Sequence, residues 1–424
     1  MKTAVNEMLG CQFPILAFSH CRDVVAAVSR AGGFGVLGAV AHTVEQLEID
    51  LAWIDEQVGD RPYGVDLLLP QKYVGAAEGG LDRSQLRQLL PPAHQEFVDD
   101  ILRRYDVPVL PEGDRPRGMG MNVSPAGYEP LLDVAFDHPI RLIASALGPP
   151  PADLIDRARS TGVKVAALAG TTAHAVKHAA AGADVIVAQG SEAGGHTGEV
   201  GTMVLVPEVV DAVAPVPVLA AGGIASGRQV AAAMALGAAG VWTGSVWLTT
   251  AEAETDPVVK QKFLAATSSD TVRSRSITGK PARMLRTQWT EEWERTDGPG
   301  PLPMPLQPLL VGEALQRINR SAHAEGSGAE SLATYFVGQV VGSISSVRAC
   351  RAGDDRRVHR HDRRACRSAR DRGRTVDVSA GSVDASRPCA RRRDAGRSTG
   401  RSQLRGATIV TVPCAAQTAV PSLV

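Results

Sequence analysis

Three apolar runs that end in glycines constrain the fold of this chain more than any other feature. They occupy residues 188–196 (AQGSEAGGH), 218–224 (VLAAGGI) and 241–245 (VWTGS). Each has the length of a strand, and the last two are each followed by a helical pattern, so bare backbone amides lie where a strand passes into a helix. Amides at helix N-termini bind phosphate. Three such turns at the spacing of β/α units therefore predict a phosphate-binding cradle.

The rest of the first 347 residues alternates between strand and helix patterns. Strands are predicted at 13–18, 34–39, 63–69, 141–147, 164–169, 185–189, 217–221 and 240–247, and helices at 23–30, 43–58, 151–161, 172–181, 207–213, 226–236 and 257–266. Eight β/α units with phosphate-binding turns after the last two strands predict an α/β fold of the (β/α)8 or TIM-barrel type, with its site at the strand C-termini. A doubly wound open sheet is the alternative. It favours a Gly-x-Gly-x-x-Gly at the first turn, where this chain has Ala17-Phe18-Ser19-His20.

Two segments depart from this alternation and suggest how the chain is divided. Residues 70–138 are rich in Pro, Gly and charged helical stretches, which indicates an insertion over one end of the fold. Residues 270–347 contain further helical patterns and a proline-rich stretch, typical of a helical lid or second lobe. We therefore expect a barrel at 1–269 with an insertion at about 70–138, a lid or lobe at 270–347, and a low-order tail at 348–424.

Composition and the N-terminal sequence lead us to expect a soluble protein. The hydrophobic content is 44%, and no apolar run is long enough to cross a bilayer. The N-terminus has no apolar signal core, so we expect a cytoplasmic protein without membrane contact. Cys11 and Cys21 are the only cysteines before residue 350, which does not indicate a disulfide framework. No metal site is predicted.

The net charge of zero averages two unlike regions. Residues 348–424 contain 18 Arg, no Lys, 7 Asp and no Glu, which leaves 27 of the 45 basic and 38 of the 45 acidic residues in the preceding part. An arginine-rich arm that binds nucleic acid is one interpretation of this tail. A wrong reading frame through GC-rich DNA is the other, because a selected arm normally mixes Lys with Arg. Suitable codons for residues 356–370, shifted by one base, encode the amphipathic peptide DVFIDTIDALAGLR. Our hypothesis is that a frameshift near Arg348 replaced the last helix, and no nucleic-acid partner is expected.

The glycine-rich series resembles that of a known family. The segments Gln-Gly-x-Glu-Ala-Gly-Gly-His, Ala-Ala-Gly-Gly-Ile and Gly-Ser are similar to those of nitronate monooxygenases, formerly called 2-nitropropane dioxygenases, over about residues 10–347. Enoyl reductases of the flavin type share most of these motifs. The resemblance implies a TIM barrel with non-covalently bound FMN.

The resemblance also implies roles for particular residues. Gln189 corresponds to the side chain that reaches the flavin ring, and Gly194 and Gly195 to the backbone that approaches beside it. Gly222 and Gly223 correspond to one side of the phosphate site, and the turn Trp242, Thr243, Gly244 and Ser245 to the other side. Glycines allow N–H groups to approach phosphate without a Cβ in the way, although helix–strand packing is the alternative reason for them.

Two positions depart from the family pattern. Ala146 occupies the place at the end of the fourth strand where the family usually has its catalytic base, a histidine. Alanine cannot take a proton, so the usual abstraction from a nitroalkane loses its main group. Asp66 lies where an asparagine commonly contacts the flavin. Its carboxylate either disfavours anionic reduced flavin or bonds a backbone amide, and the sequence leaves both open.

Other ionisable residues follow the predicted strands. His196 is the best remaining candidate for a catalytic group, as a donor to the flavin or to a substrate carbonyl, with a structural role as the alternative. His20 follows the first strand and either faces the same site or lies in a loop. Glu192 is expected to cap neighbouring amides. The basic residues between Arg273 and Arg286 form either a solvated face or a patch for the phosphates of a nucleotide or an acyl-CoA.

These observations predict an FMN-dependent oxidoreductase that oxidises alkyl nitronates or a related small substrate with O2. The alternative is an NAD(P)H-dependent flavin reductase that acts on an enoyl thioester or a quinone, with NAD(P)H as co-substrate. A flavin-binding protein without turnover is a third interpretation, since Ala146 removes the usual base. The expected partner is a small-molecule substrate, and the sequence does not predict the oligomeric state.

Overall fold

The computed structural model describes residues 2–350, except residues 71, 112–121 and 325. All described residues belong to one compact unit. The predicted arginine-rich tail, residues 348–424, thus lies outside the described residues apart from its first three.

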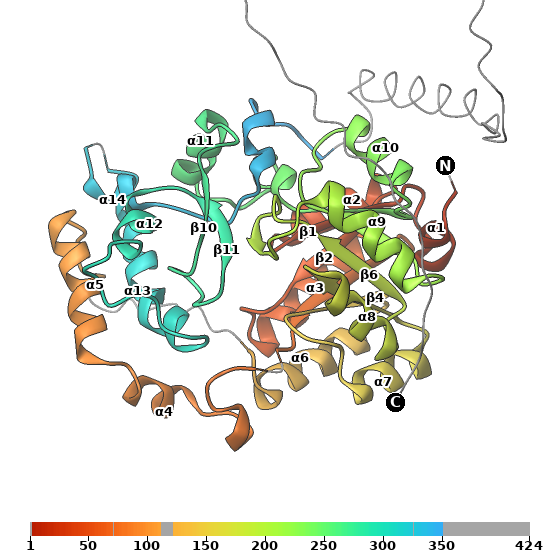
Figure 1. Ribbon diagram of the computed structural model, residues 1–424, viewed down its shortest axis with the longest axis horizontal. Coiled ribbons are helices and arrows are strands. Elements are labelled where there is room, and N and C mark those ends of the chain that lie inside the picture. The colour runs from red at the N-terminus through yellow and green to blue at the C-terminus, as the bar shows by residue number, and fades with distance from the viewer. Residues whose placement is uncertain (1, 71, 112–121, 325, 351–424) are drawn as a thin grey trace, which may run out of the picture. The chain divides into compact units, whose positions relative to one another are not determined.

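Eight parallel strands close into a barrel, which confirms the predicted fold (Figure 1). The first and last strands pair with each other, as Leu16 lies opposite Trp242, so the open doubly wound sheet is excluded. The strands lie within the predicted ranges or end one residue away from them. Their bounds are β1 Ile15–Ser19, β2 Phe34–Gly38, β3 Tyr63–Leu68, β4 Leu142–Ala146, β5 Lys164–Ala169, β6 Val185–Gln189, β8 Val218–Ala221 and β9 Gly240–Thr243.

Helices connect the successive strands of the barrel. They are α2 Arg22–Arg30, α3 Val44–Val58, α6 Pro125–Asp137, α7 Ala152–Thr161, α8 Thr172–Ala180, α9 Thr202–Val213 and α10 Gly227–Ala235. Helix α3 begins as predicted, because Thr43 and Gln46 form a reciprocal capping box. Among the described residues, no helix combines the length and apolarity needed to span a bilayer.

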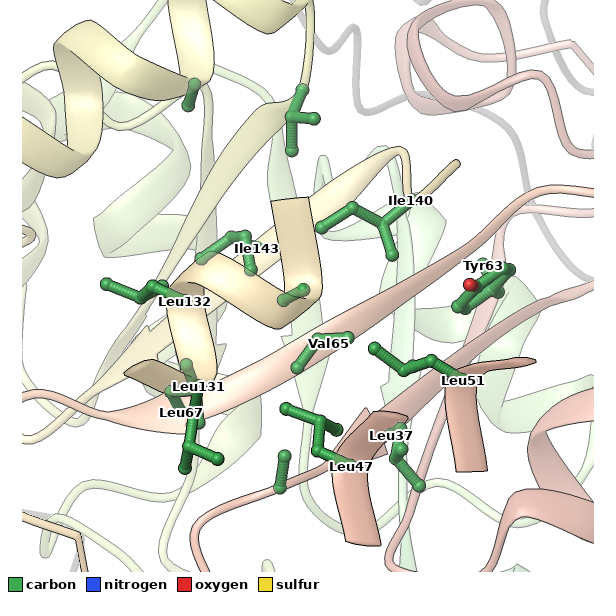
Figure 2. Close-up of a cluster of buried hydrophobic side chains, with 14 of the residues drawn as sticks. Leu37, Leu47, Leu51, Tyr63, Val65, Leu67, Leu131, Leu132, Ile140 and Ile143 are labelled. Atoms are coloured by element: carbon green, nitrogen blue, oxygen red, sulfur yellow. The ribbon is translucent and has the colours of Figure 1, made fainter. Parts of the chain in front are cut away.

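Alternating side chains of each strand pack on the two sides of the barrel wall. In β3, Tyr63, Val65 and Leu67 point outward and are buried against α3 and α6 (Figure 2). The interior is filled by residues such as Leu16, Phe34 and Val187 and is closed at its N-terminal end by helix α1 (Ala4–Leu9), which the sequence analysis did not predict. In β3, the residues that alternate with the outward-facing ones, Gly64, Asp66 and Leu68, therefore face the barrel interior.

A second body, which we call the lobe, has its own apolar core. It contains residues 83–107 from the insertion and residues 257–343, and Trp289, Phe263 and Ile101 are buried at its centre. Its elements are α4 Arg83–Gln88, α5 Pro92–Arg104, α11 Pro257–Ala265, β10 Thr271–Ser274, β11 Ala282–Leu285, α12 Gln288–Trp293, α13 Leu306–Ser321, α14 Gly328–Leu332 and the 3-10 helix η3 Gln339–Ser343; two further 3-10 helices are η1 Ala76–Glu78 and η2 Ser245–Trp247.

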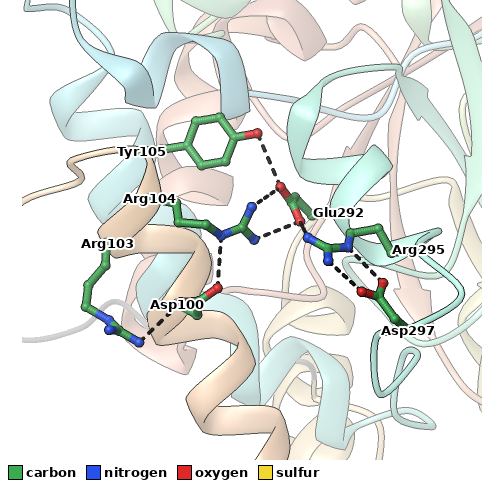
Figure 3. A network of polar contacts seen from close by, with 7 residues as sticks. All are labelled: Asp100, Arg103, Arg104, Tyr105, Glu292, Arg295 and Asp297. Atoms are coloured by element: carbon green, nitrogen blue, oxygen red, sulfur yellow. Dashed lines mark hydrogen bonds and ion pairs between the residues drawn. The ribbon is translucent and has the colours of Figure 1, made fainter.

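A network of charged groups joins the two parts of the lobe that are distant in sequence (Figure 3). Arg104 at the end of α5 donates two hydrogen bonds to the carboxylate of Glu292 on α12, with N···O distances of 2.6 and 2.8 Å. Arg295 and the hydroxyl of Tyr105 also donate to Glu292. The buried Glu292 carboxylate thus ties the insertion to the C-terminal part of the lobe, and its hydrogen bonds to Arg104 lower its pKa.

Some elements differ from the sequence-based expectation. Helix α9 begins at Thr202 and not near Pro207, since the Glu192 carboxylate caps its first turn. The region expected to be helical after residue 270 also contains β10 and β11, which form a three-stranded sheet with β7 (Gly195–His196). These strands are two to four residues long and carry Arg, Ser and Thr, so they lack a clear apolar alternation.

Candidate active site

A cavity of about 1330 Å³ opens at the C-terminal ends of the barrel strands and is closed on the other side by the lobe. This volume exceeds the 300–1,000 Å³ of a typical single-ligand pocket. All eleven site residues predicted from the sequence line it: Asp66, Gln189, Gly194, Gly195, His196, Gly222, Gly223, Trp242, Thr243, Gly244 and Ser245. The fold thus brings together side chains that lie up to 179 positions apart, between Asp66 and Ser245.

The loop after β6 is held by contacts that leave no room for side chains. A Cβ on Gly190 would lie 2.1 Å from the hydroxyl oxygen of Thr202, and one on Gly194 would lie 2.8 Å from the amide nitrogen of Gly338. The Glu192 carboxylate accepts hydrogen bonds from the backbone and the hydroxyl of Thr202, both at 2.9 Å. The expectation that Glu192 caps amides is confirmed. Close packing on the chain itself accounts for the glycine at 194.

The turn after β8 presents backbone without side chains to the cavity. Gly222 and Gly223 have φ values of +94° and +72°, a conformation that other residues rarely adopt. Helix α10 follows at Gly227, and its N-terminus has no side-chain cap. The amide of Gln229 donates to the Ser226 carbonyl, and the part of this turn that lines the cavity is Gly222, Gly223 and Ile224.

The turn after β9 is partly occupied by internal bonds. The Trp242 ring stacks on Phe18, with ring centroids 6.2 Å apart. The Thr243 hydroxyl donates to the Leu16 carbonyl at 3.1 Å and accepts from the indole of Trp247. It has no proton left for a ligand. The Ser245 oxygen accepts from the amide of Gly338 at 2.8 Å, so its own proton stays available.

Asp66 is the least satisfied polar residue of the barrel wall. The residue is 6% exposed, and its Oδ2 has no hydrogen-bond partner among the described residues. Its neighbours in register are Gly38 and Ala144, which offer no polar side chain. Burial raises the pKa of Asp66 to about 8. The carboxyl group is therefore protonated at neutral pH and adds no negative charge to the cavity.

His196 lies on the lobe side of the cavity, where β7 pairs with β11. Its Nε2 is 2.8 Å from the hydroxyl oxygen of Thr278. Burial, and next the charge of Lys280, lower the pKa of His196 to about 4, so the imidazole is neutral at physiological pH. Burial also lowers the pKa of Lys280, which lines the cavity. This wall thus offers a neutral imidazole and an amine to a substrate.

The end of β4 carries no acid or base. Ala146 lines the cavity with a methyl group, and the next residue, Leu147, has a φ of +70°. The adjacent Ser145 points away from solvent, and its hydroxyl is buried without a partner among the described residues. The position that the family resemblance assigns to a base is chemically inert.

The basic residues after the barrel do not form a common phosphate-binding patch. Arg283 is buried and donates to the carbonyl of Ser191 at 2.7 Å, and Arg275 donates to the carbonyl of Gly279. Arg273 donates to the carbonyl of Thr197. The interpretation as a shared patch is wrong for these three arginines, because each is used to hold backbone carbonyls. Lys280 is the member of the cluster that lines the cavity.

The lobe also brings residues to the cavity that the sequence analysis did not name. They include Asn319 on α13 and Tyr335 and Phe336 in the segment after α14. Tyr335 reaches the site because its carbonyl accepts from the amide of Leu285 on β11. No local pattern marks these residues, since their place depends on a short, irregular sheet.

Comparisons with known proteins agree with this geometry. The family model described as nitronate monooxygenase matches residues 3–352. The chain belongs to the nitronate monooxygenase family. It is therefore a flavin-dependent oxidoreductase.

Two curated relatives illustrate the range of sequence similarity. Rv1533 of Mycobacterium tuberculosis, assigned as a monooxygenase, is 68% identical over 353 residues, which cover 83% of this chain and 94% of the relative. A protein of Staphylococcus saprophyticus assigned as a nitronate monooxygenase is 28% identical and covers 77% of this chain and 90% of the relative.

Two solved structures align with this chain over nearly their whole length. A nitroalkane oxidase from Streptomyces ansochromogenes aligns with a TM-score of 0.69 at 26% identity, covering 87% of this chain and all of that chain. FabK from Thermotoga maritima aligns with a TM-score of 0.63 at 26% identity, covering 88% and 99%. Both cover the barrel together with the lobe.

Proposed function

We propose that this chain binds FMN in the cavity and oxidises alkyl nitronates, or a related small anionic substrate, with O2. The observation that carries this proposal is the cavity itself, in which three glycine turns of the barrel meet a polar wall of the lobe. The family, and the likeness to a nitroalkane oxidase, support the substrate class.

The residues of the barrel wall fit an FMN molecule. The backbone of Gly222 and Gly223 and the Ser245 hydroxyl offer donors to a phosphate. Gln189 at the end of β6 offers an amide to the ring, and the protonated Asp66 can donate a hydrogen bond from the cavity floor. When bound, the flavin supplies an electron-pair acceptor that O2 can reoxidise.

The residues of the lobe wall fit a small anion. No acidic side chain among the described residues forms an ion pair with the Lys280 ammonium group, and its partial burial strengthens an electrostatic contact with a substrate. The neutral imidazole of His196 lies beside Lys280 and leaves the local charge positive. A nitronate is an anion, so this wall would position it without a catalytic step of its own.

The alternative is an NAD(P)H-dependent reductase of an enoyl thioester or a quinone. Two features favour it: the cavity is larger than a single-ligand pocket, and Ala146 removes the usual base. An anaerobic titration separates the two functions. Bleaching of the flavin absorbance by ethyl nitronate, without bleaching by NADH or NADPH, supports nitronate oxidation. The reverse pattern supports the reductase, and no bleaching by either supports a flavin-binding protein without turnover.

A further inference from the structure

His20 lies directly after β1 and faces the cavity that contains the predicted flavin site. Its side chain lines the cavity, and its ring packs edge-on against Phe18 with centroids 5.1 Å apart. The side chain is exposed, and the Phe18 ring and the Gly38 carbonyl contact it. A ring in this position is fixed in orientation and accessible to a ligand.

One hydrogen bond determines which nitrogen of His20 carries the proton. Nδ1 is 2.7 Å from the carbonyl oxygen of Gly38, and a carbonyl oxygen can only accept, so Nδ1 is the protonated nitrogen. Gly38 is required for this contact, because a Cβ there would lie 2.7 Å from Nδ1. In the neutral ring, Nε2 therefore presents a lone pair, and no described residue donates to it.

The surroundings favour the neutral form of this imidazole. Burial lowers the pKa of His20, and the nearby His42 lowers it further, while the bond to Gly38 opposes them. His42 itself is paired with Asp50, with Nε2 and Oδ2 3.0 Å apart. Asp66, opposite Gly38 in register, is protonated up to about pH 8 and does not offer a charge that would hold His20 in the imidazolium form.

The other histidines that line the cavity are less suited to accept a proton. Nε2 of His196 bonds Thr278, and Nε2 of His42 bonds Asp50. His178 bonds the Leu168 carbonyl through Nε2, and its Nδ1 is buried away from the cavity space. The His174 ring stacks on His178 with centroids 6.4 Å apart, and no hydrogen bond to a described residue fixes its tautomer. Of these five described histidines, His20 combines a fixed tautomer with a bare nitrogen at the cavity.

We propose that His20 is the base that removes the α-proton of a neutral nitroalkane in this cavity, in place of the side chain that Ala146 lacks. The C–H bond breaks, the proton forms an N–H bond at Nε2, and the electron pair is delocalised into the nitro group to give the nitronate. The imidazolium returns its proton to solvent after the product leaves. This role rests on the proposed function, because it generates the nitronate that is oxidised there.

The test compares two substrates that differ by this one proton. Reduction of the flavin is followed anaerobically with neutral nitroethane and with preformed ethyl nitronate, in the wild-type chain and in His20→Asn. The asparagine amide keeps a donor at the position of Nδ1 and lacks Nε2. We expect reduction by nitroethane to slow by about 100-fold or more, as for loss of a general base, and reduction by the nitronate to change by less than about threefold. His323→Asn, at an exposed histidine that does not line the cavity, is the control and is expected to resemble the wild type with both substrates.

The outcomes separate this inference from the proposed function. A wild-type flavin that preformed nitronate does not reduce overturns the proposed function, and the role of His20 with it. If ethyl nitronate reduces the wild-type flavin, and nitroethane reduces the flavin of His20→Asn at the wild-type rate, the role of His20 as the base is overturned and the proposed function is not. An equal loss with both substrates does the same, because it indicates a binding or folding defect.

A measurement on the wild-type chain does not depend on the variant. Long-range 1H–15N correlation spectra report which nitrogen of each histidine is protonated. We expect His20 to be neutral and protonated at Nδ1 at about pH 7. A ring protonated at Nε2, or charged at this pH, contradicts the proposal whether or not the variant folds.

Discussion

The two walls of the cavity are built in different ways. The barrel wall presents the glycine turns after β6 and β8 and apolar side chains to the cavity, with Asp66, Gln189 and His20 among its polar groups. The lobe wall carries polar side chains, among them His196, Lys280 and Tyr335, on a short sheet and irregular segments. A wall of bare backbone suits a cofactor that every member of a family shares, whereas a wall of side chains suits selection of the substrate.

The largest expected effect is a loss of flavin affinity after a substitution in the barrel wall. In Gly222→Val, the side chain would meet the Ala193 amide and the Thr202 hydroxyl at 3.0 Å, at a φ of +94°. Backbone strain of about 1–3 kcal/mol adds to this steric conflict, and we expect flavin affinity to fall by about 100-fold or more. The flavin content of the purified protein and a titration with FMN measure it.

Gly162→Val is the matched control for that change. Gly162 has a φ of +78°, but a Cβ there would meet nothing within 4 Å. The control is expected to lose stability from strain and to keep its flavin affinity. If both variants bind flavin equally well, the turn after β8 does not contact the cofactor.

The next prediction concerns the pH dependence that Asp66 imposes on stability. The folded chain holds the Asp66 proton up to about pH 8, whereas the unfolded chain releases it near the ordinary pKa of 3.8. The free energy of unfolding should therefore fall as pH rises from about 4 to about 8. In Asp66→Asn this contribution is absent, so the variant should gain on the order of 3 kcal/mol over the wild type between about pH 5 and about pH 8. Urea unfolding of the flavin-free chains at the two pH values measures the difference, and parallel curves would show that Asp66 is ionised in the fold.

A smaller effect is expected on the lobe wall. Lys280→Met should raise KM for an anionic nitronate by about tenfold, because it removes a partly buried positive charge. Flavin affinity should not change. Lys164→Met, at the start of β5 and away from the cavity, is the control. A loss of flavin in Lys280→Met would mean that the two walls do not divide their tasks as described.

The smallest expected effect is a loss of stability after a change in the charged network of the lobe. Glu292→Gln should lower the free energy of unfolding by about 1–2 kcal/mol at neutral pH, since it weakens the charged hydrogen bonds from Arg104. The pKa of Glu292 is lowered in the fold, so this contribution should be present above its ordinary pKa and disappear as pH falls through the folded value. Glu291→Gln, exposed on the same helix, is the control. Equal losses in both variants would argue against the network in Figure 3 as a specific support.

The barrel could be predicted from the sequence, and the lobe could not be predicted in detail. Strands such as Val185–Gln189 are apolar runs bounded by turn residues, and helix α3 carries its own capping signal. The sheet of the lobe depends on pairing between Gly195–His196 and Ala282–Leu285, which are separated by 85 residues or more in the chain. Pairing at that distance leaves no local periodicity to detect.

The same contrast holds within the site. The glycine turns were predictable because positive φ values and close packing require glycine at these positions. His20 was identified only as a histidine after a strand, since its tautomer depends on the Gly38 carbonyl of the neighbouring strand. The protonation of Asp66 depends on its burial without hydrogen-bond partners, and this arrangement is not visible in the local sequence. The frameshift hypothesis for residues 348–424 stays a prediction, although the family match ends at residue 352.

Identification of the bound cofactor tests whether the folded chain holds FMN. The full chain, purified and then denatured, releases any non-covalent flavin for mass spectrometry and for quantification by absorbance. We expect one molecule of FMN to be released per chain, either from the protein as purified or after reconstitution with FMN. FAD in its place, or no binding of FMN by the folded chain, would contradict a barrel wall built to hold that cofactor.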